Sequence, residues 1–322
     1  MAAKLDPDLA KILPLLPLRD AATLTPERAR AELVALAESR KDVPMPDVAR
    51  AEDVTVAGAA GPLAARLFAT TRKPAPTVVY FHGGGWVAGD LVTHERQART
   101  LAQELDGCVL SIDYRRPPEV PFPGAFEDCL AATKWAAANI GKLGDDAARL
   151  AVAGDSAGGN LAAAVAQASR DQGPGGGPRL AAQMLVYPAV DLTGNYAAAA
   201  ENAKYPSRQE NADGYFLTGD AMRFFAGHYL PRLTDSEDPR ASPLRNRDLG
   251  GLPPAVVTTA EFDPLRDEGE AYGEALKRAG VEVAYFREAG MVHGYFGMGA
   301  ASPAADAARK RATAAFRKML GG

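Results

Sequence analysis

The sequence predicts an α/β fold with a mainly parallel central sheet flanked by helices and with a helical cap. Short apolar runs recur from residue 54 onward, and helix-like segments lie between most of them. Alternation of strand and helix is typical of parallel sheets joined by right-handed crossovers. Two stretches, 1–50 and about 194–240, stand outside this alternation and are the candidates for the cap. A chain of 322 residues can bury a sufficient core without disulfides or metals.

The predicted strands are short and apolar. The first two, 54–56 and 65–69, are separated by Gly58 and by Gly61-Pro62, a turn signal that favours an antiparallel pair. The run 77–81 is almost entirely apolar, as in a strand covered on both faces. Further strands are predicted at 108–112, 150–153, 184–187, 255–258 and 281–286. Helices are predicted at 93–105, 126–139, 161–169 and 266–278.

The first 50 residues predict one clear helix. Thr25 supplies a capping hydroxyl, Pro26 suits the first helical position, and strong helix formers continue over 29–39. Pro44 and Pro46 end the element. Either this segment is an accessory cap or it is a plain helix packed on the surface, and the sequence leaves both interpretations open.

The stretch 194–240 is a long insertion between two strands, with a predicted helix at 219–230. Phe224, Phe225, His228 and Tyr229 fall at helical spacing within it. Simple packing is the favoured interpretation of this stripe, while a role in covering a pocket stays open. A glycine- and proline-rich run at 173–178 is predicted to be a connecting loop.

Composition argues against several classes of partner. The chain has 36 Lys and Arg against 40 Asp and Glu, a net charge of −4, so it lacks the basic excess that binds nucleic acid. Cys108 and Cys129 match no metal or redox spacing and predict buried thiols in a reducing cytosol. The apolar run 9–18 is too short to span a bilayer and is not followed by a cleavage site. We therefore expect a cytoplasmic protein without a membrane span.

The clearest chemical motif is Gly-Asp-Ser-Ala-Gly at 154–158, between an apolar strand and an alanine-rich helix. A serine at such a strand-to-helix turn needs flanking glycines because the chains pass closely. The turn lifts the hydroxyl to a helix N-terminus, where a developing anion is favoured. Ser156 is therefore the predicted nucleophile.

A second motif, His-Gly-Gly-Gly at 82–85, follows the strand 77–81. Consecutive glycines are entropically costly unless the backbone must approach something closely. In an acyl-transfer site the substrate carbonyl oxygen needs such backbone N–H donors. A further donor comes from the residue after the nucleophile, here Ala157.

A serine nucleophile needs a base, and the chain has four histidines. His82 opens the glycine motif, so we expect it to order that loop. His94 and His228 fall in predicted helices, where a packed or surface histidine is expected. His293 lies in a predicted loop at 290–295, late in the chain, where the order Ser, Asp, His places the base.

The acid that orients this base should follow a strand between the serine and the histidine. Asp263 lies just past the strand 255–258, with Pro264 beside it. Glu261 is the alternative, although it is predicted to belong to the strand end. Asp267 is predicted to cap the next helix. Asp263 would hold the histidine tautomer and stabilise the imidazolium.

Together these motifs resemble the hormone-sensitive-lipase-like esterases of the α/β-hydrolase fold. The resemblance rests on 82–85, on Gly-Asp-Ser-Ala-Gly-Gly-Asn at 154–160, on Asp-Pro-Leu-Arg-Asp at 263–267 and on His-Gly at 293–294, and it covers roughly 50–320. The chain departs from the family pattern at 116–119, Arg-Pro-Pro-Glu, away from these motifs. The implied organisation is an N-terminal cap segment at 1–50 and a catalytic domain at 51–322 with a cap insertion at about 194–240.

The resemblance implies hydrolysis of carboxylic esters with short to medium acyl chains. It maps the oxyanion donors to Gly84 and Gly85, beside Ala157, and it implies no cofactor and no metal. The expected partner is a small-molecule ester, and a homodimer is a reasonable expectation. An amidase or deacetylase with the same three residues stays open, as does a non-catalytic binding protein on the same fold. The presence of His293 in its loop disfavours the binding protein.

Overall fold

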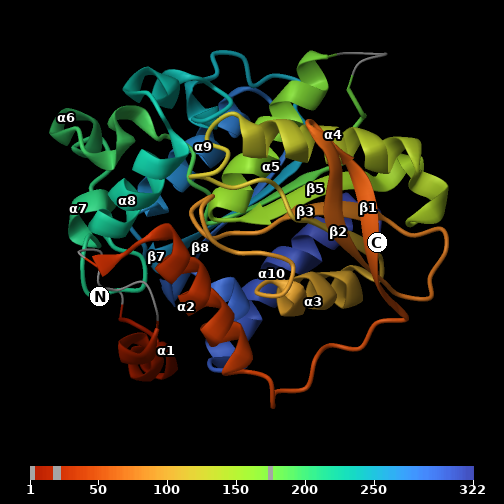
Figure 1. Ribbon diagram of the computed structural model, residues 1–322, viewed down its shortest axis with the longest axis horizontal. Coiled ribbons are helices and arrows are strands. Elements are labelled where there is room, and N and C mark those ends of the chain that lie inside the picture. Colours follow the sequence, from red (N-terminus) through yellow and green to blue (C-terminus); the bar gives the residue numbers. More distant parts are fainter. Residues whose placement is uncertain (1–3, 17–22, 173–176) are drawn as a thin grey trace.

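The computed structural model describes residues 4–16, 23–172 and 177–322, which contain one eight-stranded sheet (Figure 1). The strands are β1 (Arg50–Gly58), β2 (Gly61–Ala69), β3 (Thr77–Phe81), β4 (Cys108–Ile112), β5 (Leu150–Asp155), β6 (Gln183–Val186), β7 (Ala255–Phe262) and β8 (Val283–Val292). Their order is β1-β2-β4-β3-β5-β6-β7-β8. β2 is antiparallel to β1 and to β4, and the other pairs are parallel. The predicted fold class is confirmed.

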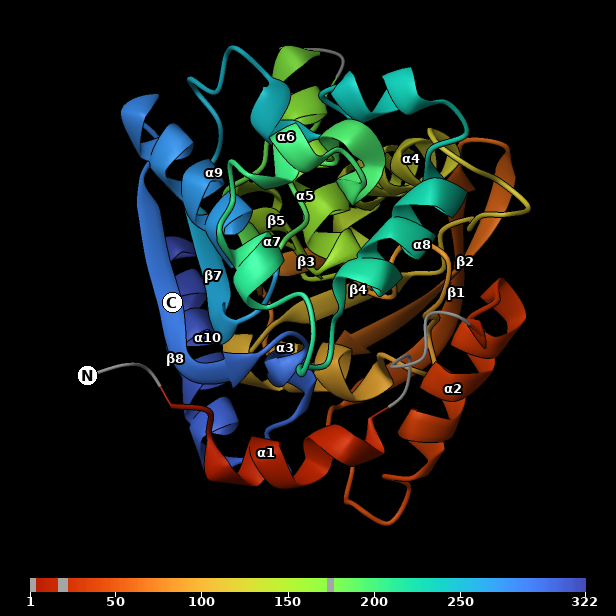
Figure 2. The ribbon, with the colours of Figure 1, turned by 90° about the vertical axis from the view of Figure 1, so that its left-hand side faces the viewer.

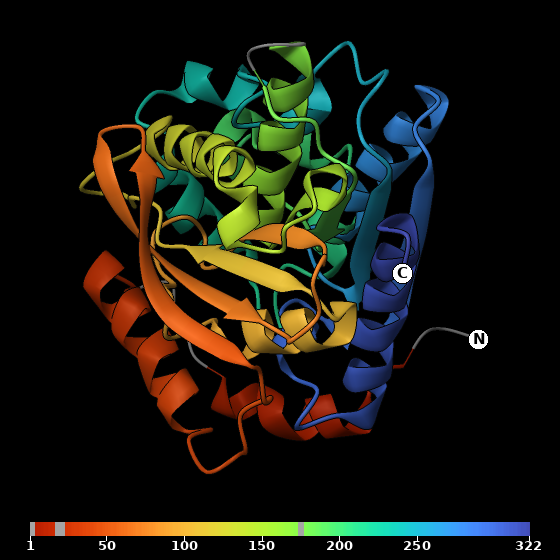
Figure 3. The ribbon, with the colours of Figure 1, turned by 90° about the vertical axis from the view of Figure 1, so that its right-hand side faces the viewer.

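Helices cover both faces of the sheet. α3 (Glu95–Leu105) and α10 (Pro303–Met319) pack on one face, and α4 (Gly124–Ala138), α5 (Ala157–Asp171) and α9 (Arg266–Arg278) pack on the other. The antiparallel β1 and β2, drawn in orange, lie at one edge (Figure 3). Successive residues of β3 supply two separate apolar clusters, Val78 to the one with α3 and Val79 to the one with α5. Because strand side chains alternate, apolar residues are needed at every position, which explains the continuous apolar run.

The N-terminal segment contains α1 (Pro7–Ile12) and α2 (Pro26–Glu38). The predicted cap of α2 is confirmed, since Thr25 Oγ1 accepts a hydrogen bond from Arg28 N at 3.2 Å. Leu9 and Leu13 bury their side chains in the cluster that contains α3 and α10. The connecting loop predicted at 173–178 falls mostly outside the described residues.

The insertion forms a group of short helices that lies with α2 at one end of the sheet (Figure 2). They are α6 (Ala199–Asn202), α7 (Ser207–Glu210) and α8 (Gly219–Tyr229). The 3₁₀ segments within the described residues include Leu13–Leu15, Ile140–Lys142, Ala147–Arg149, Thr193–Tyr196, Leu233–Glu237, Pro243–Arg245 and Tyr295–Gly297. In the predicted aromatic stripe of α8, Phe225 and Tyr229 are buried and Phe224 and His228 are half-buried.

The predicted start of the loop at 290–295 was wrong. β8 continues to Val292, so the stretch 290–292 belongs to the strand and not to a loop. The charged residues Arg287 and Glu288 hide this continuation in the sequence, yet both still pair with β7, and pairing resumes after an irregularity at Val292. Arg287 is exposed on this edge strand, whereas Glu288 is buried and forms an ion pair with Arg311 of α10. No helix within the described ranges combines the length and the apolar character that crossing a membrane requires.

Candidate active site

Ser156 occupies a strained turn between β5 and α5. Its φ of 56° and ψ of −119° lie outside the regions that L-residues prefer. A Cβ at Gly154 would overlap the carbonyl oxygen of Gly158, and a Cβ at Gly158 would overlap that of Phe81. The steric reason for the two flanking glycines is therefore present in the structure. The turn presents the serine at the N-terminus of α5.

The glycine loop approaches the serine from the end of β3. Gly84 and Gly85 have φ values of 118° and 60°, and both line the same pocket as Ser156 and Ala157. Among the described residues, no hydrogen-bond acceptor is recorded for the N–H groups of Gly84, Gly85 or Ala157. Trp86 anchors the end of the loop by stacking on Tyr229, with the ring centroids 4.5 Å apart. Three N–H groups without a recorded acceptor thus belong to residues that line one pocket.

The structure brings the predicted base and acid into contact with the serine. His293 Nε2 lies 2.9 Å from Ser156 Oγ, and His293 Nδ1 lies 2.7 Å from Asp263 Oδ2. The acceptor-only carboxylate places the ring proton on Nδ1, which leaves Nε2 to accept from the hydroxyl. Glu261, the alternative acid, belongs to β7 and instead pairs with Arg287 at 2.7 Å. The three side chains come from the carboxyl ends of β5, β7 and β8.

Two of the other histidines are held by backbone carbonyls. His82 Nδ1 donates to Gly83 O at 2.8 Å, and its ring stacks on Tyr114, so it orders the glycine loop as predicted. Its pKa falls to about 3, chiefly because burial disfavours the charged ring. His228 Nδ1 donates to Phe224 O within α8. Neither contacts Ser156.

Sequence reasoning missed a polar cluster beneath the serine. Asp155 Oδ1 accepts hydrogen bonds from Tyr80 Oη at 2.6 Å and from Gly83 N at 3.0 Å. His94 Nε2 lies 3.8 Å from Asp155 Oδ2. His94 was predicted to lie inside a helix, but it is the residue just before α3. Burial would raise the pKa of Asp155, but His94 and the Tyr80 hydroxyl outweigh it and hold that pKa below its usual value. A charged residue at the end of a buried strand was the available signal.

A pocket with a cavity volume of about 140 Å³ opens over Ser156. The N-terminal segment contributes Leu33, Leu36, Ala37 and Arg40 to its wall. The insertion contributes Tyr196, Phe216, Leu217, Ala221, Met222 and Phe225. α8 therefore both packs against the core and lines the pocket. The two interpretations of its aromatic stripe, packing and a role at a pocket, both apply.

The insertion also contacts the loop that carries the predicted acid. Ser207 Oγ donates to Pro264 O at 2.9 Å, and Asn211 Nδ2 donates to Asp263 O at 3.2 Å. Asp267 does not cap α9, contrary to the prediction. The helix begins at Arg266, so Asp267 is already its second residue. Its carboxylate instead accepts from Ser207 N at 2.7 Å, across the interface with the insertion.

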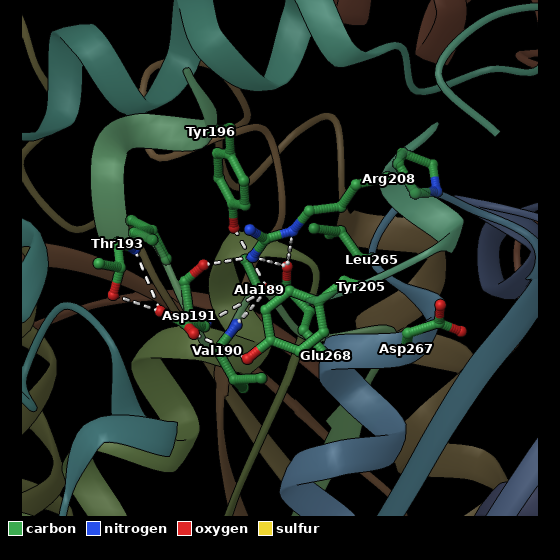
Figure 4. A network of polar contacts seen from close by, with 12 residues as sticks. Ala189, Val190, Asp191, Thr193, Tyr196, Tyr205, Arg208, Leu265, Asp267 and Glu268 are labelled. Atoms are coloured by element: carbon green, nitrogen blue, oxygen red, sulfur yellow. Dashed lines mark hydrogen bonds and ion pairs between the residues drawn. The ribbon is translucent and has the colours of Figure 1, made fainter. Parts of the chain in front are cut away.

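A buried ion pair lies next to this interface (Figure 4). Arg208 donates from Nε and Nη2 to Glu268 Oε2 at 3.1 and 2.6 Å. The guanidinium lies over the rings of Tyr196 and Tyr205, 4.6 and 4.3 Å from their centroids. Glu268 also accepts from Val190 N at 2.8 Å, so a single carboxylate joins the insertion, α9 and the loop after β6. Burial raises the pKa of Glu268 despite the cation.

Comparison with known proteins agrees with this geometry. Residues 78–297 match the family described as having the α/β-hydrolase fold. The chain belongs to this α/β-hydrolase family. Among relatives of this α/β hydrolase, Esterase LipI of Mycobacterium tuberculosis is 40% identical over 327 residues, covering 99% of this chain and 96% of LipI. Carboxylesterase NlhH of the same organism is 44% identical over 252 residues, covering 77% and 75%.

Solved structures of other α/β hydrolases share the architecture. The hyperthermophilic esterase from the archaeon Pyrobaculum calidifontis has a TM-score of 0.90 to this α/β hydrolase at 38% identity, covering 99% of this chain and all of that chain. An ester hydrolase from the metagenome of Lake Arreo, in complex with a bipyridine phosphonate derivative, has a TM-score of 0.88 at 38% identity and covers 99% of this chain. Among the described residues, no group of three His, Cys, Asp or Glu is arranged to hold a metal ion.

Proposed function

We propose that this α/β hydrolase is a serine carboxylesterase that acts on carboxylic esters with short to medium acyl chains. The observation that carries the proposal is the unbroken series of hydrogen bonds from Ser156 through His293 to Asp263. The names of the relatives, esterase and carboxylesterase, support the same activity. A pocket of about 140 Å³ with mainly apolar walls suits a small ester.

In the proposed first step, Ser156 Oγ attacks the ester carbonyl carbon while His293 Nε2 accepts the hydroxyl proton. The carbonyl oxygen gains negative charge and is stabilised by the N–H groups of Gly84, Gly85 and Ala157. Each such donor is worth roughly 100- to 1000-fold in rate. His293 then gives its proton to the leaving alkoxide, which departs as the alcohol and leaves an acyl-enzyme.

In the second step, water attacks the acyl-enzyme and His293 accepts one of its protons. The proton returns to Ser156 Oγ as the acid product leaves. Throughout, the carboxylate of Asp263 stays ionised, holds the imidazole proton on Nδ1 and stabilises the imidazolium. Asp263 is completely buried and His293 is 5% exposed, so little water competes for these contacts.

Replacement of Ser156 tests the proposal. We expect Ser156→Ala to lower kcat for p-nitrophenyl butyrate by roughly 10⁴- to 10⁶-fold, because the nucleophile is lost while the donors remain. A fluorophosphonate should label folded wild type and not the variant, and circular dichroism should show the same fold. Near-wild-type turnover by Ser156→Ala would overturn the assignment.

Amide hydrolysis is the alternative that uses the same residues. Matched esters and anilides of one acyl group, compared by kcat/KM, separate an esterase from an amidase or deacetylase. A non-catalytic binding protein would bind these compounds without turning them over.

The roles of 1–50 and about 194–240 as a cap are part of the same proposal, supported by their share of the pocket wall. A homodimer and a cytoplasmic location are also proposed. Light scattering after gel filtration tests the first. The burial of the free thiols Cys108 and Cys129 is compatible with the second.

A further inference from the structure

One arginine lies in the mainly apolar wall of the pocket. Arg40 follows the end of α2 by two residues and lines the pocket together with Gly297. Its Nη1 donates to Gly297 O at 3.0 Å. Because Gly297 is itself a wall residue, this contact places the guanidinium head, and not only the aliphatic chain, at the pocket surface.

No carboxylate balances this cation. Arg30 on the same segment forms an ion pair with Glu119, whereas Arg40 has no ion pair with any residue in the described ranges. Burial and the charge of nearby Arg96 both lower the pKa of Arg40. An arginine nevertheless stays protonated in water at neutral pH. The charge therefore costs free energy where it stands, and a bound anion would recover that cost.

A second donor lies beside the first. A Cβ placed on Gly297 would be 2.9 Å from Gln97 Nε2, so the Gln97 amide lies against the same glycine as the Arg40 guanidinium. Gln97 lines the pocket in the first turn of α3, and its side chain makes no hydrogen bond to another residue in the described part of the chain. Arg40 and Gln97 thus leave hydrogen-bond donors available at one end of the pocket.

We propose that Arg40 and Gln97 bind a carboxylate carried by the substrate, so that the preferred substrates are esters with a free carboxylate remote from the scissile bond. This rests on the proposed function, because the ester itself must reach Ser156. A guanidinium offers a planar pair of N–H donors that matches a carboxylate, and the amide adds a further donor. The carboxylate belongs either to the acyl part or to the alcohol part of the ester.

Two substrate pairs distinguish these sources. Ethyl hydrogen adipate and ethyl hexanoate differ by a carboxylate on the acyl side, and 4-acetoxybutanoate and butyl acetate differ by one on the alcohol side. Hydrolysis is followed by pH-stat titration at pH 7.5. Wild type should show the higher kcat/KM for the charged member of at least one pair, and that pair identifies the side facing Arg40.

Arg40→Gln should lower the charged-to-neutral ratio of kcat/KM for that pair by roughly 10- to 100-fold, the range expected for a hydrogen bond to a charged group. The loss should fall mainly on KM, because the contact is made equally before and during the chemical step. Arg40→Lys should restore part of the ratio, since it keeps the charge and loses the planar fork.

Lys41→Gln is the matched control. It removes one positive charge from the next residue, which is exposed and outside the pocket wall, and should leave the ratio unchanged. An equal loss in Lys41→Gln would indicate a long-range field and overturn the contact with Arg40. A preference of wild type for the neutral member of both pairs, or an unchanged ratio in Arg40→Gln, would also overturn it while the proposed function stands. If wild type hydrolyses none of the four esters, both the contact with Arg40 and the proposed function are overturned.

Discussion

Two separate segments form parts of the pocket wall, and they are attached to the rest of the protein in different ways. α2 of the N-terminal segment buries only Ala29, and its Arg30 pairs with Glu119, whose side chain is 60% exposed. α8 of the insertion buries five side chains, and the insertion is joined to α9 by the Arg208–Glu268 pair, which is 3% and 0% exposed.

The difference indicates which wall is more easily separated from Ser156, His293 and Asp263. Exposed ion pairs contribute little because water and salt screen them, whereas a buried pair becomes very costly when one partner is removed. The insertion also contacts the Asp263 loop through Asn211, and no described α2 residue contacts that loop by a recorded hydrogen bond. We therefore expect the insertion to be part of the folding core and the N-terminal segment to open more easily.

The largest expected effect is on the buried pair. Arg208→Met leaves Glu268 without its cation in a site closed to water, and should lower the free energy of unfolding by about 3–5 kcal/mol. Urea denaturation followed by circular dichroism measures it. The double variant Arg208→Met/Glu268→Gln should recover part of the loss because no buried charge remains. If Arg208→Met lowers the free energy of unfolding by less than about 1 kcal/mol, the insertion is not held more firmly than the N-terminal segment.

The second expected effect is a difference in local opening. Hydrogen exchange followed by mass spectrometry should show the amides of α2 exchanging at a lower opening free energy than those of α8, because few buried contacts hold α2 in place. The central helix α5, which buries twelve of its fifteen residues, serves as the slow reference. Equal protection of α2 and α8 would contradict the expectation.

The smallest effect is expected at the exposed pair. Glu119→Gln should cost less than about 1 kcal/mol at pH 7, and less still at high salt. The hydrogen bond from Arg30 lowers the pKa of Glu119 to about 2. A depressed carboxyl pKa stabilises the fold above its unfolded value of about 4.3 and loses that effect as pH falls.

The difference in unfolding free energy between wild type and Glu119→Gln should therefore be constant above pH 4.3 and shrink as the pH approaches 2. Denaturation curves at pH 7, 5, 4 and 3 measure this difference. Growth of the difference on acidification would show that the pair is not responsible.

Much of the site could be predicted because local sterics and chain order constrain it. The Gly154 and Gly158 spacing specifies the turn at Ser156, and the positions of Asp263 and His293 after strands are sufficient to choose the pair that contacts it. The stretch 116–119, by contrast, carried no visible meaning in the sequence. In the structure its Glu119 is the partner of α2.

What could not be predicted depends on distances between residues far apart in the chain. Asp155 and His94 are 61 positions apart, they belong to no recognisable motif, and nothing local in the sequence links them. Arg208 and Glu268 likewise meet across 60 positions. The end of β8 was missed because charge in an edge strand resembles charge in a loop. Periodicity detects faces of elements, whereas these features depend on which elements meet.

The carboxylate of Asp155 has a consequence for motion. It belongs to the residue before Ser156 and also holds the first amide of the glycine loop, at Gly83. We therefore expect displacements of Ser156 and of the loop at Gly84 and Gly85 to be correlated, so that their separation varies less than it would without this contact. Misplacement by about 1 Å can cost roughly 100-fold in rate. One buried carboxylate thus links the turn that holds Ser156 to the loop that holds Gly84 and Gly85.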